Sequence, residues 1–330
     1  MFSFANTRKH VYELQGMTCY DVFNGDADGI CALVQLRLAD PRTAELVTGV
    51  KRDINLLARV NAEAGDHITA LDISMRTNAD GLRRNLAAGA HVFYVDHHNP
   101  GDIPDHKNLN AVIDTRPNIC TSLLVDQCLE GAFREWAVVA AFGDNLADAA
   151  IASASSLSIN NAAITKLKSF GELINYNAYG RDTSDLHFTP EYLFRQCVQY
   201  ETPSEFLSAN PQIFDKLETG YAVDMVKAKK CGFIVPGVTI LDDAPWARRV
   251  SGSFGNILAV GNPNQAHAVL THNSDEGYLL SVRAPKNNPY GADKLCLGFP
   301  TGGGRAAAAG INHLPKGELE TFIAKFTQIF

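Results

Sequence analysis

The sequence predicts an α/β protein whose N-terminal part is a parallel β-sheet with helices on both faces. Two observations lead to this fold class. Short apolar segments typical of strands alternate with helical segments through the first half of the chain, and strands separated by helices predict a parallel sheet. Acidic residues also follow directly after several of these strands, which is the edge of such a sheet where ligands bind.

Five strands and five helices account for the alternation. The strands are predicted from their apolar and β-branched residues, and the third helix ends at a glycine, which is a common helix stop. The predicted strands are residues 19–23, 44–50, 67–74, 91–95 and 110–114. The predicted helices are residues 30–40, 54–64, 77–89, 120–130 and 134–144.

Composition limits the class of protein and its partners. Hydrophobic residues make up 46% and charged residues 20% of the 330 residues, as in globular proteins. The net charge of -7 argues against long duplex nucleic acid, although a local basic pocket could still bind a small anion. The seven cysteines form no CxxC pair, and neither a signal peptide nor an apolar run of about 18 residues is present. We therefore expect a cytoplasmic protein with reduced cysteines and no membrane partner.

Acidic and histidine side chains gather where the predicted strands end. Carboxylates converging on one edge would repel one another unless cations lay among them. Oxygen ligands with one or two imidazoles suit Mn²⁺ or Mg²⁺ better than a metal that prefers thiolates. The sequence therefore predicts a metal site. Its residues are Asp26 and Asp28 in "NGDADG", Asp72 in "LDIS", Asp96, His97 and His98 in "DHHNP", and Asp144 in "FGDN".

Each of these motifs alone has a simpler interpretation. "NGDADG" could be a polar turn or a calcium loop, but Gln35 stands where an EF-hand needs a glutamate, and a strand precedes the loop. Asp72 and Asp144 alone could cap helices, and a histidine pair is commonly a surface feature. One metal centre explains all the motifs together, and we favour it for that reason.

The C-terminal third contains a second candidate binding region. Residues 277–285 read as a strand that carries Arg283, and three glycines precede Arg305. Glycines let a backbone approach a phosphate or a base closely, a helix starting after them would favour anions, and arginines offer forked donors. The alternative is a flexible loop without a ligand. The segment is not a P-loop, because no GK[ST] follows the glycines.

Six motifs in this order resemble the DHH phosphoesterase superfamily, in the branch with a DHH-associated C-terminal domain. These motifs are "GDADG", "LDIS", "DHH", "FGDN", "SVRAP" and "GGGRAAAAG". The branch includes RecJ-like exonucleases, oligoribonucleases and cyclic-dinucleotide phosphodiesterases. The resemblance implies a DHH catalytic domain at 1–185, a helical connector at 186–228 and a smaller α/β substrate-binding domain at 229–330, with the active site in the cleft between the two domains.

The resemblance also implies roles for the matching residues. Asp26, Asp28, Asp72, His97 and Asp144 would bind one or two Mn²⁺ ions, with Mg²⁺ as the alternative, and Asp72 would bridge two ions. Asp96 would orient the histidines, and His98 would hold the scissile phosphate or assist the leaving oxygen. A hydroxide held by the metal would attack phosphorus. The implied substrate-binding residues are Ser281, Arg283, Gly302, Gly303, Gly304 and Arg305.

Three further residues follow the fifth strand, and their role is open. Arg116, Asn118 and Thr121 could line the pocket, but turn and helix-capping roles are the favoured interpretation. Arg116 is kept as a candidate substrate contact.

Two positions depart from the family pattern. Phe23 stands where many members have a histidine ligand three residues before the first aspartate, which puts the first of two metals in question. Arg305 replaces the histidine of the GGGH motif, and arginine cannot shuttle protons. We expect this change to alter substrate preference, so that Arg305→Ala would change the Michaelis constant.

The expected activity is Mn²⁺-dependent hydrolysis of short linear oligonucleotides, dinucleotides such as pGpG above all. The acidic net charge and the glycine–arginine segment, which suits a substrate with a defined end, favour short substrates. A RecJ-like single-strand exonuclease and a cyclic-dinucleotide phosphodiesterase are the enzyme alternatives. A nucleotide-binding sensor with a degenerate metal site is the non-enzyme alternative. A homodimer is compatible with the sequence.

Overall fold

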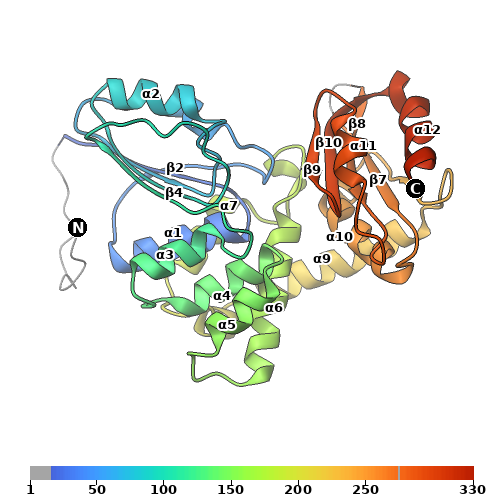
Figure 1. Cartoon of the computed structure of the whole chain (residues 1–330). Coiled ribbons are helices and arrows are strands. Elements are labelled where there is room, and N and C mark those ends of the chain that lie inside the picture. The colour runs from blue at the N-terminus through green and yellow to red at the C-terminus, as the bar shows by residue number, and fades with distance from the viewer. Residues whose placement is uncertain (1–15, 274–275) are drawn as a thin grey trace. The chain divides into compact units, whose positions relative to one another are not determined.

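The computed structural model describes residues 16–273 and 276–330, and these fall into two compact units (Figure 1). Unit 1 comprises residues 16–178 together with His187–Leu217. Unit 2 comprises Tyr179–Leu186 and Glu218–Phe330. The domain limits at 185 and 228 stay a prediction.

The sheet of unit 1 has five strands, all parallel, in the order β2-β1-β3-β4-β5. The predicted parallel α/β fold is therefore confirmed. The strands are β1 (Cys19–Phe23), β2 (Glu45–Val47), β3 (His67–Leu71), β4 (His91–Asp96) and β5 (Leu109–Ile113).

Helices cover both faces of this sheet (Figure 1). On one face, α1 is buried almost throughout and packs against α3 and α4. On the other face, α2 and a short 3₁₀ helix, η1, pack against strand side chains in a single apolar cluster. The helices are α1 (Ala27–Ala39), η1 (Leu56–Arg59), α2 (Ala79–Ala87), α3 (Thr121–Cys128), α4 (Arg134–Gly143), α5 (Ala147–Ala154), α6 (Asn161–Asn177), α7 (Pro190–Cys197) and α8 (Pro203–Ala209). A further helix, α9 (Pro211–Lys230), begins in unit 1 and ends in unit 2.

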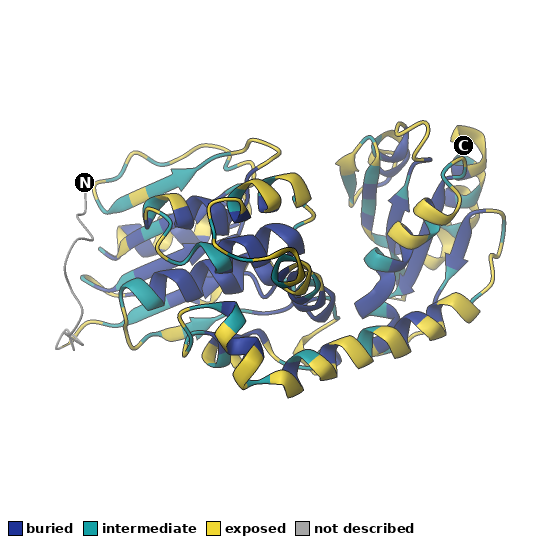
Figure 2. Ribbon diagram, turned by 90° about the horizontal axis from the view of Figure 1, so that it is seen from below, coloured by how far each residue is buried: buried dark blue, intermediate teal, exposed yellow. Residues whose placement is uncertain are grey.

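The core of unit 1 follows this layering. Burial in Figure 2 is concentrated in the strands and in the helix faces that lie on them. Large side chains that are fully buried include Trp136 on α4 and Tyr94 on β4. Two buried layers separated by a sheet hold the strand ends firmly, which is what a site at the carboxyl edge requires.

The helix predicted at residues 54–64 is wrong. Only Leu56–Arg59 is helical, as a single 3₁₀ turn. Side chains from the α2 region satisfy the backbone of this segment in place of helical hydrogen bonds. The Asn78 amide accepts from the Leu57 N–H at 3.0 Å, and Arg84 donates to the carbonyls of Leu57 and Val60 at 3.1 and 2.8 Å.

Unit 2 has a mixed sheet in the order β6-β7-β8-β10-β9, which confirms the smaller α/β C-terminal domain. Its strands are β6 (Val238–Ile240), β7 (His267–His272), β8 (Gly277–Arg283), β9 (Gly302–Arg305) and β10 (Ala308–Pro315). Its helical elements are η2 (Thr183–Asp185), α10 (Pro245–Gly261), α11 (Ala292–Leu297), η3 (Lys316–Glu318) and α12 (Leu319–Ile329).

The triple glycine of unit 2 does not lead into a helix, as the anion-binding argument supposed. Residues 302–305 form β9, which pairs with β10 in an antiparallel hairpin, with Gly304 opposite Ala309. Gly304 has a φ of +141°, and a Cβ there would lie 2.4 Å from the Ala309 Cα. The glycine therefore permits the close pairing of the two strands.

The helices of the described residues offer no candidate membrane span, because none combines the necessary length with enough apolar residues. All seven cysteines lie in the described part of the chain and are free thiols. The cytoplasmic location stays a prediction.

Candidate metal centre

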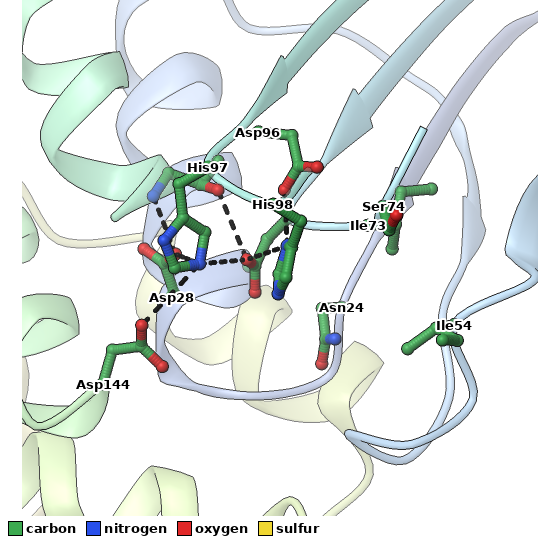
Figure 3. A network of polar contacts seen from close by, with 12 residues as sticks. Asn24, Asp28, Ile54, Ile73, Ser74, Asp96, His97, His98 and Asp144 are labelled. Carbon is green, nitrogen blue, oxygen red and sulfur yellow. Dashed lines mark hydrogen bonds and ion pairs between the residues drawn. The ribbon is translucent and has the colours of Figure 1, made fainter. Parts of the chain in front are cut away.

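The topology brings the predicted acidic clusters to one place, since β1, β3 and β4 are neighbours in the sheet and all run in the same direction. Asp26 and Asp28 follow β1, Asp72 follows β3, and Asp96 is the last residue of β4. Figure 3 shows Asp28 and Asp96 near the ends of the strands, with Asp144 approaching from the end of α4.

Asp26 and Asp28 are held by the first turns of two helices. Asp26 caps α1, and its Oδ1 accepts from the backbone N–H groups of Asp28 and Gly29 at 3.0 and 3.1 Å. Asp28 accepts from the N–H groups of Thr121 and Ser122, at the start of α3, at 2.8 and 2.7 Å. Both carboxylates are buried, and these hydrogen bonds fix their orientation.

Asp72 has an unusual backbone. Its φ of +57° is in the left-handed region, which is uncommon for a residue other than glycine and concentrates at functional sites. Its N–H donates to the carbonyl of Val95 at 3.1 Å, and its Oδ1 accepts from the Thr121 hydroxyl at 3.3 Å. Thr121 is the first residue of α3, and the cap position is Cys120. The favoured capping role for Thr121 is therefore wrong, since its hydroxyl belongs to the site.

His97 presents one ring nitrogen to three carboxylates. Its Nδ1 lies 2.9 Å from the carbonyl of Ile119, which can only accept, so Nδ1 carries the proton of the neutral ring. The Nε2 lone pair then faces oxygens of Asp72, Asp144 and Asp28, at 3.5, 3.7 and 3.9 Å (Figure 3).

This arrangement of donor atoms fits a divalent cation. The three carboxylates repel one another, and the separations around Nε2 exceed hydrogen-bond distance. Ligands about 2.1 Å from one ion lie roughly 3 Å or more apart, which is close to the separations observed. Two groups of residues hold ligand atoms within 4.8 Å of one another: Asp28, His97 and Asp144, and Asp72, His97 and His98.

The pKa values of the central acids reflect the same repulsion. Burial, and then the charges of Asp28 and Asp26, raise the pKa of Asp72 well above its usual range. Burial also raises the pKa of Asp28, and Asp144 adds to this effect while His97 opposes it. A divalent cation among these oxygens would favour the ionised carboxylates and remove the penalty.

His98 and Asp96 form a pair beside this group. His98 Nδ1 lies 2.7 Å from Asp96 Oδ1, so the ring donates to the carboxylate and directs Nε2 away from it. Burial lowers the pKa of His98, but the hydrogen bond and charge of Asp96 outweigh it, and the pKa is raised. Asp96 is fully buried, while the His98 side chain is 46% exposed and can therefore meet a substrate.

Asp144 reaches the group from the C-terminal end of α4. Gly143 lets this end approach α1, because a Cβ there would lie 2.5 Å from the Ala27 Cβ. The Asp144 side chain is 21% exposed, so it lies on the open side of the group.

Two site residues were missed by the sequence reasoning. Lys51 Nζ contacts Asp26 Oδ2, lies 3.5 Å from Asp144 Oδ1, and donates to Asn175 Oδ1 at 3.0 Å. A signal for Lys51 existed, because it directly follows the strand predicted at 44–50 and so falls at the same sheet edge. Asn175 is on α6 and has no comparable signal.

The three arginines predicted to bind substrate differ in their hydrogen-bond partners and exposure. Arg283 donates to Asn256 Oδ1 at 2.7 Å and to the Ser281 hydroxyl at 2.9 Å, so these two predicted residues are in contact. Arg305 is exposed on β9. Arg116 is exposed and donates to Asp114. Their contact with a substrate stays a prediction.

Sequence comparisons and structure comparisons give different results for this protein. No family model and no curated protein matches the sequence. Solved structures do match. A DHH-domain protein described as a member of a family of ribosomal proteins has a TM-score of 0.66 at 14% identity, over 95% of this chain and 86% of that one. The chain has a DHH-superfamily fold.

Two further structures with this fold have named activities. The exonuclease RecJ bound to manganese has a TM-score of 0.58 at 16% identity, over 94% of this chain and 89% of that one. The pGpG-specific phosphodiesterase PggH from Vibrio cholerae has a TM-score of 0.53 at 15% identity, over 94% of this chain and 98% of that one. The DHH fold predicted from the motifs is thereby confirmed.

Proposed function

We propose that the protein is a Mn²⁺-dependent phosphodiesterase that hydrolyses short linear oligonucleotides, dinucleotides such as pGpG above all, to mononucleotides. The observation that carries the proposal is the lone pair of His97 Nε2 facing the carboxylates of Asp28, Asp72 and Asp144 at 3.5 to 3.9 Å. These four residues are the proposed metal ligands. A bound divalent ion supplies Lewis acidity, which polarises a phosphoryl oxygen and acidifies water.

The remaining catalytic roles belong to His98 and Asp96. His98, held by Asp96, presents Nε2 to the scissile phosphate and donates a proton to it or to the leaving oxygen. The raised pKa of His98 favours the protonated ring that this role requires. Water supplies the oxygen that joins phosphorus, so no side chain is consumed, and the products are a nucleoside monophosphate and a free hydroxyl group.

Three observations support a short substrate. The chain carries a net charge of -7, which disfavours long polyanions. Unit 2 offers two arginines, Arg283 and Arg305, beside a glycine hairpin, and we propose that these contact the far end of the substrate. The match with PggH covers nearly all of both chains. A RecJ-like exonuclease is the second candidate, because RecJ has the higher TM-score.

The test is hydrolysis by the purified protein with Mn²⁺. The substrates are 5′-phosphorylated diguanylate, an RNA length series, c-di-GMP and pyrophosphate, and the Asp72→Ala variant controls for contaminating nucleases. We expect GMP release from the dinucleotide, rates that fall with length, and no release by the variant. Fastest cleavage of long strands would instead assign the exonuclease. Nucleotide binding without turnover of any substrate would assign the sensor.

A further inference from the structure

A lysine of the chain itself lies among the acidic residues of the metal centre. The Nζ of Lys51 has three oxygen partners: Asp26 Oδ2 in direct contact, Asn175 Oδ1 at 3.0 Å and Asp144 Oδ1 at 3.5 Å.

The backbone on both sides holds Lys51 in this place. Its N–H donates to the carbonyl of Ala178 at 2.9 Å, and its carbonyl accepts from Asn24 Nδ2 at 3.2 Å. Gly25 lets the segment pass, because a Cβ there would lie 1.9 Å from the Gly49 carbonyl oxygen. The Lys51 side chain is 22% exposed. These backbone contacts fix Lys51 beside Asp26, so the pair is part of the fold and is not a chance contact at the surface.

Both carboxylate oxygens of Asp26 already have partners, namely Lys51 and the first turn of α1. Its Oδ1 accepts from two N–H groups and its Oδ2 contacts Lys51. Among residues 16–273 and 276–330, neither group with metal-ligand spacing includes Asp26.

Phe23 stands three residues before Asp26, at the end of β1. Its side chain is fully buried and packs against Phe194, with ring centroids 5.8 Å apart. The position three residues before Asp26 therefore contributes an aromatic ring to the core and no ligand atom.

We propose that the ammonium group of Lys51 takes the place of a second divalent ion, so that the protein binds one ion per chain, at Asp28, Asp72, His97 and Asp144. The inference rests on the proposed function for the identity of that ion. A second dication beside Asp26 would face the Lys51 charge within a few ångströms, and hydrogen bonds already occupy both oxygens of Asp26. Lys51 is thus a positioning residue that sets the metal stoichiometry.

The test counts bound Mn²⁺ per chain after equilibrium dialysis, by elemental analysis, at a concentration that saturates the wild type. We expect one ion for the wild type and one for Lys51→Arg, which keeps the charge. Lys51→Met keeps the length of the side chain without the charge and should bind two. Adding Asp26→Asn to Lys51→Met should return the count to one, because the amide still caps α1 but is a poor metal ligand.

Two ions in the wild type, or one ion in a folded Lys51→Met variant, would overturn the inference. Circular dichroism checks folding. If Lys51→Met does not fold, electron paramagnetic resonance of wild-type protein with two equivalents of Mn²⁺ decides. Isolated ions support the inference, and an exchange-coupled pair contradicts it. Hydrolysis is scored separately: turnover with two ions overturns the inference alone, and one ion without turnover overturns the proposed function alone.

Discussion

Two buried acids on neighbouring strands of the same sheet have opposite surroundings. Asp21, in the middle of β1, receives both arms of Arg37, at 2.8 and 2.5 Å, and Thr69 completes the cluster. Asp72, at the end of β3, faces other carboxylates and a histidine lone pair. Asp21 is neutralised by Arg37 of the same chain, and the pair stabilises the fold. Among the residues that the structure describes, no lysine or arginine pairs with the second acid, which is expected where a site must hold an exchangeable ion.

Unit 2 supports the same distinction. Its buried acid Asp224 is paired with Arg249 at 2.7 Å, and Asp185 is paired with Arg248 at 2.7 Å. These pairs join η2 and α9 to α10. Acids paired within the chain serve folding, so substitutions in the two classes should have opposite effects on stability and function.

The largest effect is expected from Asp72→Asn. Loss of this carboxylate should lower turnover by at least about 10⁴-fold, as for loss of a group that acts in a catalytic unit. The metal-free variant should be as stable as the wild type or more stable, because one buried charge is removed and Asn tolerates the left-handed φ. Chelator-treated unfolding curves and steady-state rates measure both effects. A variant that is less stable and still active would contradict the comparison.

The second effect is expected from Asp21→Asn, which leaves the Arg37 charge buried and unpaired. The free energy of unfolding of unit 1 should fall by about 3 to 5 kcal/mol. Urea unfolding followed by Trp136 fluorescence, with Trp246→Phe to silence unit 2, reports on this unit. Asp80→Asn is the matched control, since Asp80 pairs with Arg83 on the exposed surface of α2, and it should change stability by less than about 0.5 kcal/mol. Mn²⁺ affinity of the folded protein should not change in either variant, and a lower affinity in Asp21→Asn would place Asp21 in the site.

The sheet and the acid cluster were predictable from the sequence because both depend on short-range patterns. An apolar strand followed by acidic residues is visible locally, and the parallel topology then brings the strand ends together. Asp144 was recognisable as an acid that closes an apolar helical run, but the position of that helix end depends on how α4 packs on α1.

The remaining features depend on long-range contacts that have no local pattern. Residues 54–64 carry helical periodicity, but Asn78 and Arg84, more than 20 residues away, satisfy the backbone in another conformation. The hydroxyl of Thr121 and the side chain of Asn175 reach the site across separate segments. Single polar residues near a strand or helix end are too common for their sequence position to reveal this.

The smallest effect is the pH dependence of stability in the chelator-treated protein. The change of stability with pH should have opposite signs for the clustered acids and for the acids paired with arginine. The pKa of Asp72 is raised above its ordinary 3.8 by burial and by neighbouring acids. Its contribution to stability is therefore present below that value and is lost as pH rises through the folded pKa. For Asp185, burial raises the pKa but Arg248 lowers it further, so its contribution is present above 3.8 and is lost below.

Thermal unfolding in EDTA between pH 2.5 and pH 8 measures this difference, with Trp136 reporting on unit 1 and Trp246 on unit 2 in single-tryptophan variants. The stability of unit 1 should fall with rising pH by up to about 1.4 kcal/mol per pH unit for each proton released. Asp72→Asn should flatten this slope, and Arg248→Met should leave it unchanged because it acts in unit 2. Added Mn²⁺ should reverse the slope in the wild type, since the ion binds the deprotonated acids. A slope that survives in Asp72→Asn would mean that other groups of unit 1, Asp28 among them, cause it, and that Asp72 carries no penalty for the ion to relieve.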